Sequence, residues 1–444
     1  MLNLAKGTVT NRRCALHIGR YTGFITLVLA ANQILPTSAY ADDPVREAEH
    51  DVILHMNEQI QELQAKVKEL EARLNTITPT APAHAVGDAP VSAPSLGATR
   101  PTTPSPSQES PEENPGPSVK LRMFGDIGYR ATDRKGRTNS FTIGTMDLFM
   151  TGALSDRVSV LGEVLFTPRQ GNIIRTDVER LLLQYKHNDY FNFGIGRYHT
   201  SIGYYNTAFH QGTWFETTND RPYMYGFNDR GGFLPLQEVG MTINGQIPCG
   251  RLGLNYVAEM GNGRVHLLGS EPAQSFRDIN NGKSFNLALF VRPSWIPGLQ
   301  TGFSIYHDYL TFSNNINHSE LISTAYAVYG SSNYEFLNEA MLVRHTGSIT
   351  GAPGVFHTPG FYTQFSRRFG KYRPYFRYAY VNAGVAEPIY GNPTDGSVVG
   401  RRNGPTLGLR YDLNDHSAVK LQFNHLARRQ ENYNELVTQF AFAF

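Results

Sequence analysis

The C-terminal stretch, residues 434–444, alternates apolar and polar positions with the two-residue period of a β-strand. One face of such a strand holds Leu436, Thr438, Phe440, Phe442 and Phe444. The other face holds small or polar residues. A soluble sheet would bury the aromatic face in a core, whereas a transmembrane β-barrel turns that face to lipid and keeps the polar face for its lumen. The pattern therefore predicts a strand and leaves both kinds of sheet open.

The same alternation recurs between residue 119 and the C-terminus, in about sixteen segments of the ~10 residues that a tilted membrane strand needs. The shortest predicted connections are residues 154–156, 187–189, 248–250, 369–371 and 414–416. Between them lie longer ones, predicted at 131–140, 200–235, 261–283, 346–359 and 382–404. Short turns at one end and long loops at the other are typical of membrane barrels. We therefore predict an all-β fold, a transmembrane antiparallel barrel over residues 119–444.

A heptad pattern precedes the predicted barrel. Apolar residues spaced alternately by three and four are Ile53, Met56, Ile60, Leu63, Val67, Leu70, Leu74 and Ile77. This spacing predicts a coiled-coil helix within residues 42–78, and its core residues leave dimer and higher states open. A single amphipathic helix lying on the barrel or the membrane is the alternative. Residues 79–118 are rich in Pro, Ala, Ser and Thr and predict an extended linker.

The first 41 residues have the features of a secretory signal peptide. Arg12, Arg13 and Arg20 form a basic start, residues 24–35 are apolar, and Ala39-Tyr40-Ala41 forms a cleavage site. We therefore predict export, with the mature chain beginning at Asp42.

Composition narrows the possible functions. The chain has 444 residues and a formal net charge of +2, which argues against nucleic acid as a partner. Cys14 lies in the predicted signal peptide, so Cys249 is the single cysteine of the predicted mature chain, which excludes an internal disulfide. Known catalytic motifs, such as G-x-S-x-G and H-E-x-x-H, do not occur in the sequence. We therefore expect neither an enzyme nor a bound metal or cofactor.

The terminal Phe444, the strand number and the long loop after the fifth strand resemble the 16-stranded trimeric porins of the bacterial outer membrane. The coiled coil and linker resemble the N-terminal arms of some phosphate-selective and dicarboxylate-type porins. The resemblance covers residues 119–444. It implies a barrel surrounded by outer-membrane lipid, an N-terminal arm in the periplasm, and a homotrimer. It also implies passive diffusion of small hydrophilic solutes, with the third loop folded into the lumen as a constriction.

Candidate pore residues follow from loop placement and strand alternation. The predicted constriction residues are Tyr204, Trp214, Arg221, Asp229 and Arg230, all in the loop after strand five. The predicted basic residues of the lumen are Lys120, Arg122, Arg180, Lys186, Arg292 and Arg410. Guanidinium groups bind carboxylate and phosphate in a bidentate fork, so small anionic or polar solutes are the expected cargo. Carboxylates on the same face make the predicted anion preference weak.

Two other interpretations stay open at this point. Lumenal arginines and carboxylates can pair across strands and serve the wall alone, and the aromatic residues of the loop can serve its packing. The alternative function is an outer-membrane anchor, in which the coiled coil binds the peptidoglycan cell wall or a periplasmic partner. An ordered constriction loop favours the channel, because an anchor needs none.

Overall fold

The computed structural model describes residues 118–209, 216–226, 232–265, 273–311, 317–348, 353–390, 400–429 and 431–444. The predicted signal peptide, coiled-coil helix and nearly all of the linker lie outside these residues, so they stay predictions. Among the described residues, no helix is long and apolar enough to cross a membrane.

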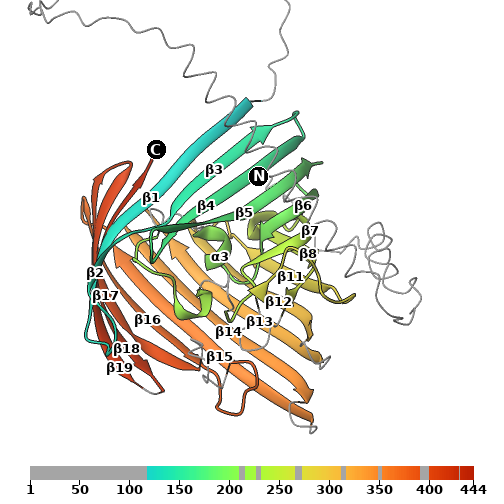
Figure 1. The fold of residues 1–444 in the computed structure, drawn as a ribbon. Helices are drawn as coiled ribbons and strands as arrows, with labels where there is room; N and C mark the ends of the chain where they lie inside the picture. The colour runs from blue at the N-terminus through green and yellow to red at the C-terminus, as the bar shows by residue number, and fades with distance from the viewer. Residues whose placement is uncertain are drawn as a thin grey trace, which may run out of the picture. The chain divides into compact units, whose positions relative to one another are not determined.

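The described chain forms one closed antiparallel barrel (Figure 1). Two of its segments, β2 and β3, together form one interrupted strand, which gives sixteen strands and confirms the predicted fold class. The barrel strands are β1 (Ser118–Thr132), β2 (Ser140–Ile143), β3 (Met146–Ala153), β4 (Val158–Arg169), β5 (Ile173–Lys186), β6 (Asn192–His199), β7 (Gln237–Ile247), β8 (Leu254–Gly261), β11 (Ser284–Val291), β12 (Leu299–Thr311), β13 (Asn317–Gly330), β14 (Tyr334–Ser348), β15 (Pro353–Arg367), β16 (Tyr372–Asn382), β17 (Arg401–Asn414), β18 (Ser417–Arg428) and β19 (Asn432–Ala443). A separate hairpin is formed by β9 (Arg264–Val265) and β10 (Ala273–Gln274).

The barrel closes where its last strand meets its first. Strand β19 pairs with β1 from Phe124 opposite Ala443 to Thr132 opposite Glu435. Phe444 continues this pairing, because its backbone N–H donates to the carbonyl of Met123 at 2.9 Å and its carbonyl accepts from the Met123 N–H at 2.7 Å. The C-terminal strand expected from the alternation is therefore the strand that completes the ring.

The two faces of each strand differ in chemistry, as β14 illustrates. Its buried residues, which face the barrel interior, are Leu337, Glu339, Met341, Val343 and His345. Its outward residues include Phe336, Ala340, Leu342 and Arg344. Exposed Phe, Leu and Ile side chains recur on the outward face of the other strands, including Phe303, Phe361 and Phe440. An apolar belt of this kind is the surface that a membrane barrel presents to lipid.

The longest connections lie at one end of the barrel, although two connections at that end, residues 170–172 and 429–431, are as short as the turns at the other end. The five connections that the sequence predicts to be short do join neighbouring strands by short turns: β3 to β4, β5 to β6, β7 to β8, β15 to β16, and β17 to β18. Residues 346–359, expected as a long loop, lie largely in strands, because β14 runs to Ser348 and β15 begins at Pro353. Proline is tolerated there because β15 pairs with β16 only from Gly360 onward, so at Pro359 one edge of the strand has no barrel partner.

Strand β5 contains a β-bulge. Glu163 pairs with Arg180, and the next residue, Val164, pairs with Val178, so Glu179 has no counterpart on β4. As a result two consecutive side chains, Glu179 and Arg180, face inward, while Val178 and Leu181 on either side are exposed on the outer face.

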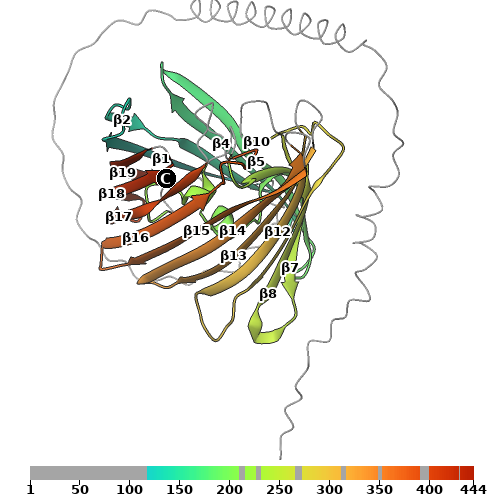
Figure 2. The same cartoon turned by 90° about the horizontal axis from the view of Figure 1, so that it is seen from below.

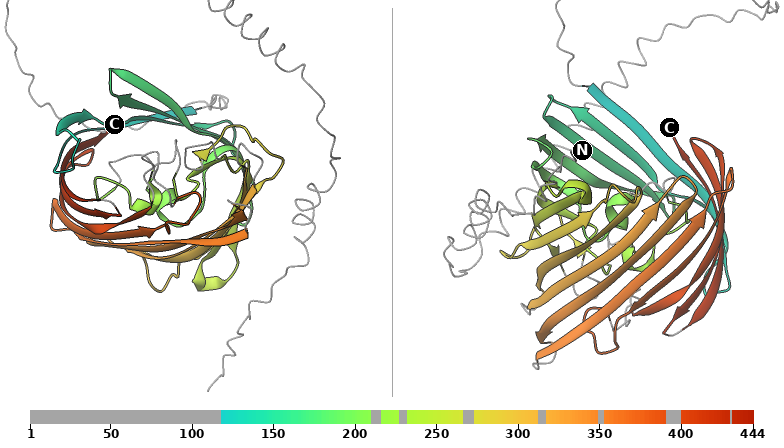
Figure 3. Two further views of the ribbon diagram at one scale, coloured as in Figure 1. Left: turned by 60° about the horizontal axis from the view of Figure 1, so that its bottom comes forward. Right: turned by 180° about the vertical axis from the view of Figure 1, so that it is seen from behind.

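Part of the long connection between β6 and β7, residues 200–236 and here named loop three, lies inside the ring of strands. The ribbon viewed along the barrel shows its green segments within the ring (Figure 3), and the view from below agrees (Figure 2). Its described part contains a short helix, α3 (Tyr205–Ala208), and a 3-10 turn, η2 (Tyr223–Tyr225). Apolar side chains of the loop join a core with the inner faces of β12–β16.

Candidate functional site

One end of loop three is held by a single buried carboxylate, Glu339 of β14. Glu339 accepts hydrogen bonds from the backbone N–H groups of Tyr204 at 2.6 Å and Tyr205 at 3.0 Å. It also accepts from the hydroxyls of Tyr225, at 2.7 Å, and of Tyr362 on β15. Four donors therefore surround a side chain that is only 2% exposed, which satisfies the carboxylate without a cation.

Aromatic rings fill the space around this carboxylate. The Tyr205 ring stacks on Tyr225 at 5.3 Å between centroids and meets Tyr362 edge to face at 5.9 Å. Tyr204 lies 5.6 Å from Tyr326 of β13. Aromatic pairs at these separations add to the apolar area that they bury, so they fix the loop against the wall.

The other described end of loop three is held by the basic wall of β16–β18. The guanidinium of Arg377 donates to the Asp220 carboxylate, to the Asp220 carbonyl at 2.6 Å and to the Thr218 hydroxyl at 3.0 Å. Lys420 donates to the Thr218 carbonyl at 3.0 Å. Arg410 donates to the Glu216 carbonyl at 3.1 Å. These wall residues thus bind the loop.

Loop three also contains an internal ion pair. Glu216 and Arg221 lie 3.7 Å apart, and both side chains are largely buried. Burial raises the pKa of the Glu216 carboxyl, and the neighbouring charges of Arg221, Lys420 and Arg377 oppose that rise.

Two of the five predicted constriction residues, Tyr204 and Arg221, lie in the described part of loop three. Tyr204 contacts the wall through its backbone and ring, and Arg221 contacts Glu216. Trp214, Asp229 and Arg230 lie outside the described residues.

The predicted basic residues fall into four groups, of which Arg180 forms the last. Arg410 holds loop three, as described above. Lys186 lies 3.8 Å from Asp189, and Arg292 donates to Gln300 at 2.8 Å, both near short turns. Lys120 and Arg122 are exposed on the inward face of β1, where Arg122 lies opposite Phe149 in register.

Arg180 shares the wall of β1 and β3–β5 with acidic neighbours. Its guanidinium lies 5.4 Å from the Phe149 ring and donates to Glu163 at 2.7 Å. Glu163 and Asp147 are buried beside it. The bulge adds Glu179, whose carboxylate lies 3.5 Å from His199 at the root of loop three. This wall is therefore mixed in charge.

A second buried cluster, which the sequence did not predict, surrounds Arg264 and His345. Arg264 of β9 donates to the carbonyl of Gly232 in loop three at 2.7 Å, to the Tyr390 hydroxyl at 2.8 Å and to Glu320 of β13. His345 of β14 lies between Glu320, at 2.8 Å, and a further carboxylate, Glu387, at 2.6 Å. These residues join loop three, the β9–β10 hairpin and the segment after β16. Their separation along the chain left no local pattern from which to predict them.

No family model and no curated protein matches the sequence. Solved structures do match the barrel. The anion-selective porin from Comamonas acidovorans aligns at 13% identity over 74% of this chain and 100% of its own, with a TM-score of 0.53. The outer membrane channel DcaP of Acinetobacter baumannii aligns at 10% identity over 74% of this chain and 98% of its own, with a TM-score of 0.51.

The chain has the fold of the outer-membrane porins. Together with the apolar outer belt, this fold identifies a protein of the bacterial outer membrane. At such low identity the likeness concerns the porin fold alone.

Proposed function

We propose that the protein is a passive channel for small hydrophilic solutes, narrowed by loop three and weakly selective for anions. The observation that carries this proposal is the fixing of loop three inside the barrel at two separate places, by Glu339 and by Arg377. A barrel that served as an anchor alone would gain nothing from such contacts. We assign the barrel no catalytic role.

The weak anion preference rests on the exposed basic residues of β1. Lys120 and Arg122 are exposed on the lumenal face, whereas Arg180 is paired with Glu163 and Arg410 with Asp412. Paired charges of opposite sign cancel much of each other's field. Lys120 and Arg122 are therefore the residues that we expect to bias the pore.

The test is the zero-current potential across a KCl gradient in planar bilayers. Wild-type protein should be weakly anion-selective, and Lys120→Ala with Arg122→Ala should shift the potential toward cations. The shift should be larger at low salt, because the Debye length is about 30 Å at 0.01 M and about 10 Å at 0.1 M. Arg157→Ala, which removes an exposed charge in the β3–β4 turn, is the matched control. A cation-selective wild type, or equal shifts in both variants, would count against the assignment.

We also propose that the channel is a homotrimer that associates through the outer face of β1–β6. The middle of that face is aliphatic, with exposed Leu121, Ile127, Val178, Leu181 and Ile195. The corresponding belt of β12–β16 is rich in phenylalanine. Sedimentation of the detergent-solubilised protein should give a trimer, and a monomer across the accessible concentration range would refute this part.

A further inference from the structure

The outward face of β12–β15 carries basic side chains at its loop end, where they take no part in the proposed channel. Strand register places His307 of β12 opposite Leu321 of β13, Leu321 opposite Arg344 of β14, and Arg344 opposite His357 of β15. All four residues have outward parity. We call His307, Arg344 and His357 the basic row.

The basic row is accessible, and the described parts of its face carry no opposite charge. Arg344 and His357 are exposed, and His307 is half-buried with its imidazole 3.1 Å from the Ser319 hydroxyl. In the described parts of β12–β15, the outward positions include no Asp or Glu. The nearby carboxylates Glu320 and Asp308 belong to the inward face and are buried.

The row lies at the edge of the apolar belt. Arg344 follows Phe336, an exposed aromatic residue near the turn end of β14, by eight residues (344 minus 336). At ~3.4 Å per residue and a tilt of about 40°, these residues span about 20 Å of height, most of a ~25 Å belt. The row therefore stands at the level of lipid headgroups on the side of the long loops.

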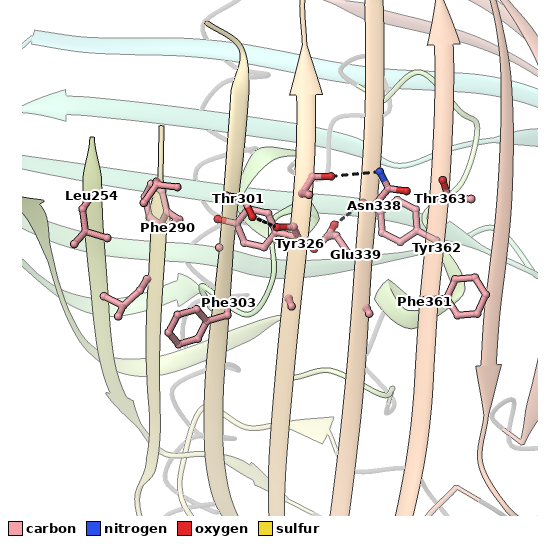
Figure 4. Close-up of a pocket in the computed structure, with 16 residues that line it drawn as sticks. Leu254, Phe290, Thr301, Phe303, Tyr326, Asn338, Glu339, Phe361, Tyr362 and Thr363 are labelled. Atoms are coloured by element: carbon pink, nitrogen blue, oxygen red, sulfur yellow. Dashed lines mark hydrogen bonds between the residues drawn. The ribbon is translucent and has the colours of Figure 1, made fainter. Parts of the chain in front are cut away.

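An apolar groove runs across β8 and β11–β15 (Figure 4). Strand register places it on the turn side of the basic row. Its volume is about 870 Å³, and Phe303, Ala325, Ala340 and Phe361 are among its lining residues. Each of these four residues is four positions from a member of the register line described above, which is about 13 Å along a strand. Small alanine side chains between two phenylalanine rings leave room for a narrow apolar group.

We propose that this face binds an anionic phosphoglycolipid of the outer leaflet. Its phosphate groups would contact Arg344 and the two histidines, and one acyl chain would occupy the groove between Phe303 and Phe361. Guanidinium groups bind phosphate through paired hydrogen bonds, and the groove offers an apolar surface at the depth of the acyl chains. Charge complementarity favours this occupant over a second copy of the chain, because the described outward positions of β1 and β3–β6 include no Asp or Glu that could pair with the basic row.

The test is lipid binding by the purified full-length protein, measured by native mass spectrometry with diphosphoryl lipid A as the probe. Wild-type protein should retain the lipid, and Arg344→Ala should weaken its binding about tenfold, as expected for loss of a charge-assisted contact. Arg157→Ala removes the same charge at the opposite end of the barrel and should leave binding unchanged. Equal binding by wild type and Arg344→Ala, or an equal loss in Arg157→Ala, would overturn the proposal.

Two further arms separate the headgroup from the acyl chain. Lipid A freed of its phosphates should bind to wild type at least as weakly as diphosphoryl lipid A binds to Arg344→Ala, because it also loses the contacts to the histidines. Equal binding of both lipids to wild type would refute the phosphate contact. Inorganic phosphate should compete poorly, because it cannot use the groove, and full competition would refute the acyl contact.

Ala340→Trp should fill the groove and weaken binding, provided that the variant shows the heat-modifiable migration of a folded barrel. Ala325→Leu is the smaller change if it does not.

Discussion

Glu339 is the residue on which the position of loop three depends most directly. Glu339→Gln would replace one acceptor oxygen by an NH₂ group that faces the N–H and hydroxyl donors of the loop. Loss of hydrogen bonds to a charged acceptor should weaken the loop contact by about 1.5–3 kcal/mol. In single-channel recordings we expect larger and noisier conductance.

Glu335→Gln is the matched control for that experiment. Glu335 lies on the same strand and the same face, and its described side-chain hydrogen bonds are with Gln364 and Ser366 of β15, not with loop three. Its recordings should match wild type. Wild-type conductance in Glu339→Gln would show that the tyrosine rings alone hold the loop.

Asp220 provides a second prediction at the same scale. Asp220→Ala would leave the buried Arg377 guanidinium without its carboxylate. We expect a loss of about 2–3 kcal/mol of stability, below the 3–5 kcal/mol of a fully buried pair because Asp220 is about one-third exposed. Urea-induced unfolding measures this loss. The exposed pair Lys186–Asp189 serves as control, where Asp189→Ala should cost at most about 1 kcal/mol, and a similar loss in both variants would contradict the expectation.

The last strand carries a prediction at the scale of an element. Deleting Phe444 removes both backbone hydrogen bonds to Met123 and an exposed ring at the membrane edge. We expect a smaller yield of heat-modifiable, folded barrel in outer membranes. Phe444→Tyr keeps the backbone bonds and an aromatic ring, so it should assemble normally. Normal assembly of the deletion variant would show that β19 closes on β1 without its final residue.

The strands of this barrel are predictable because successive side chains face lipid and lumen in turn, and the two environments favour different residues. The resulting two-residue period of apolar and polar positions locates β1, β14 and β19 from the sequence to within a few residues. A prediction from this period is wrong where proline and glycine lie within a strand. Pro359 and Gly360 belong to β15, but their residue types predicted a loop that ends at residue 359.

The partners of loop three could not be predicted from sequence. Asp220 and Arg377 are 157 residues apart, and Tyr204 and Glu339 are 135 apart. No local sequence pattern indicates which of the many inward-facing charged residues binds a loop that lies far away in the sequence. Alternation predicted that Arg410 faces inward, but only the three-dimensional structure shows that it binds the loop.

At the scale of the whole molecule, the predicted coiled coil should be separable from the barrel. Ile60→Asp with Leu63→Asp places two charges in the heptad seam and should abolish self-association of a peptide covering residues 42–78. The same changes in the full chain should leave a folded barrel, because the hydrogen bonds of the barrel close on themselves. Sedimentation of the peptide and heat-modifiable migration of the full chain measure the two outcomes. An unchanged sedimentation profile would favour the single amphipathic helix.

The bulge at Glu179 has a consequence for how such a chain can change length. Losing one residue inside a regular strand turns every later side chain of that strand to the opposite face, which exchanges lipid and lumen. Losing Glu179 would instead leave Val178 outward, Arg180 inward and Leu181 outward, in unbroken alternation. We therefore expect a single-codon deletion at residue 179 to keep both faces of the strand, at the cost of the Glu179–His199 contact, and homologous barrels that differ by one residue at this bulge to share the same outer surface.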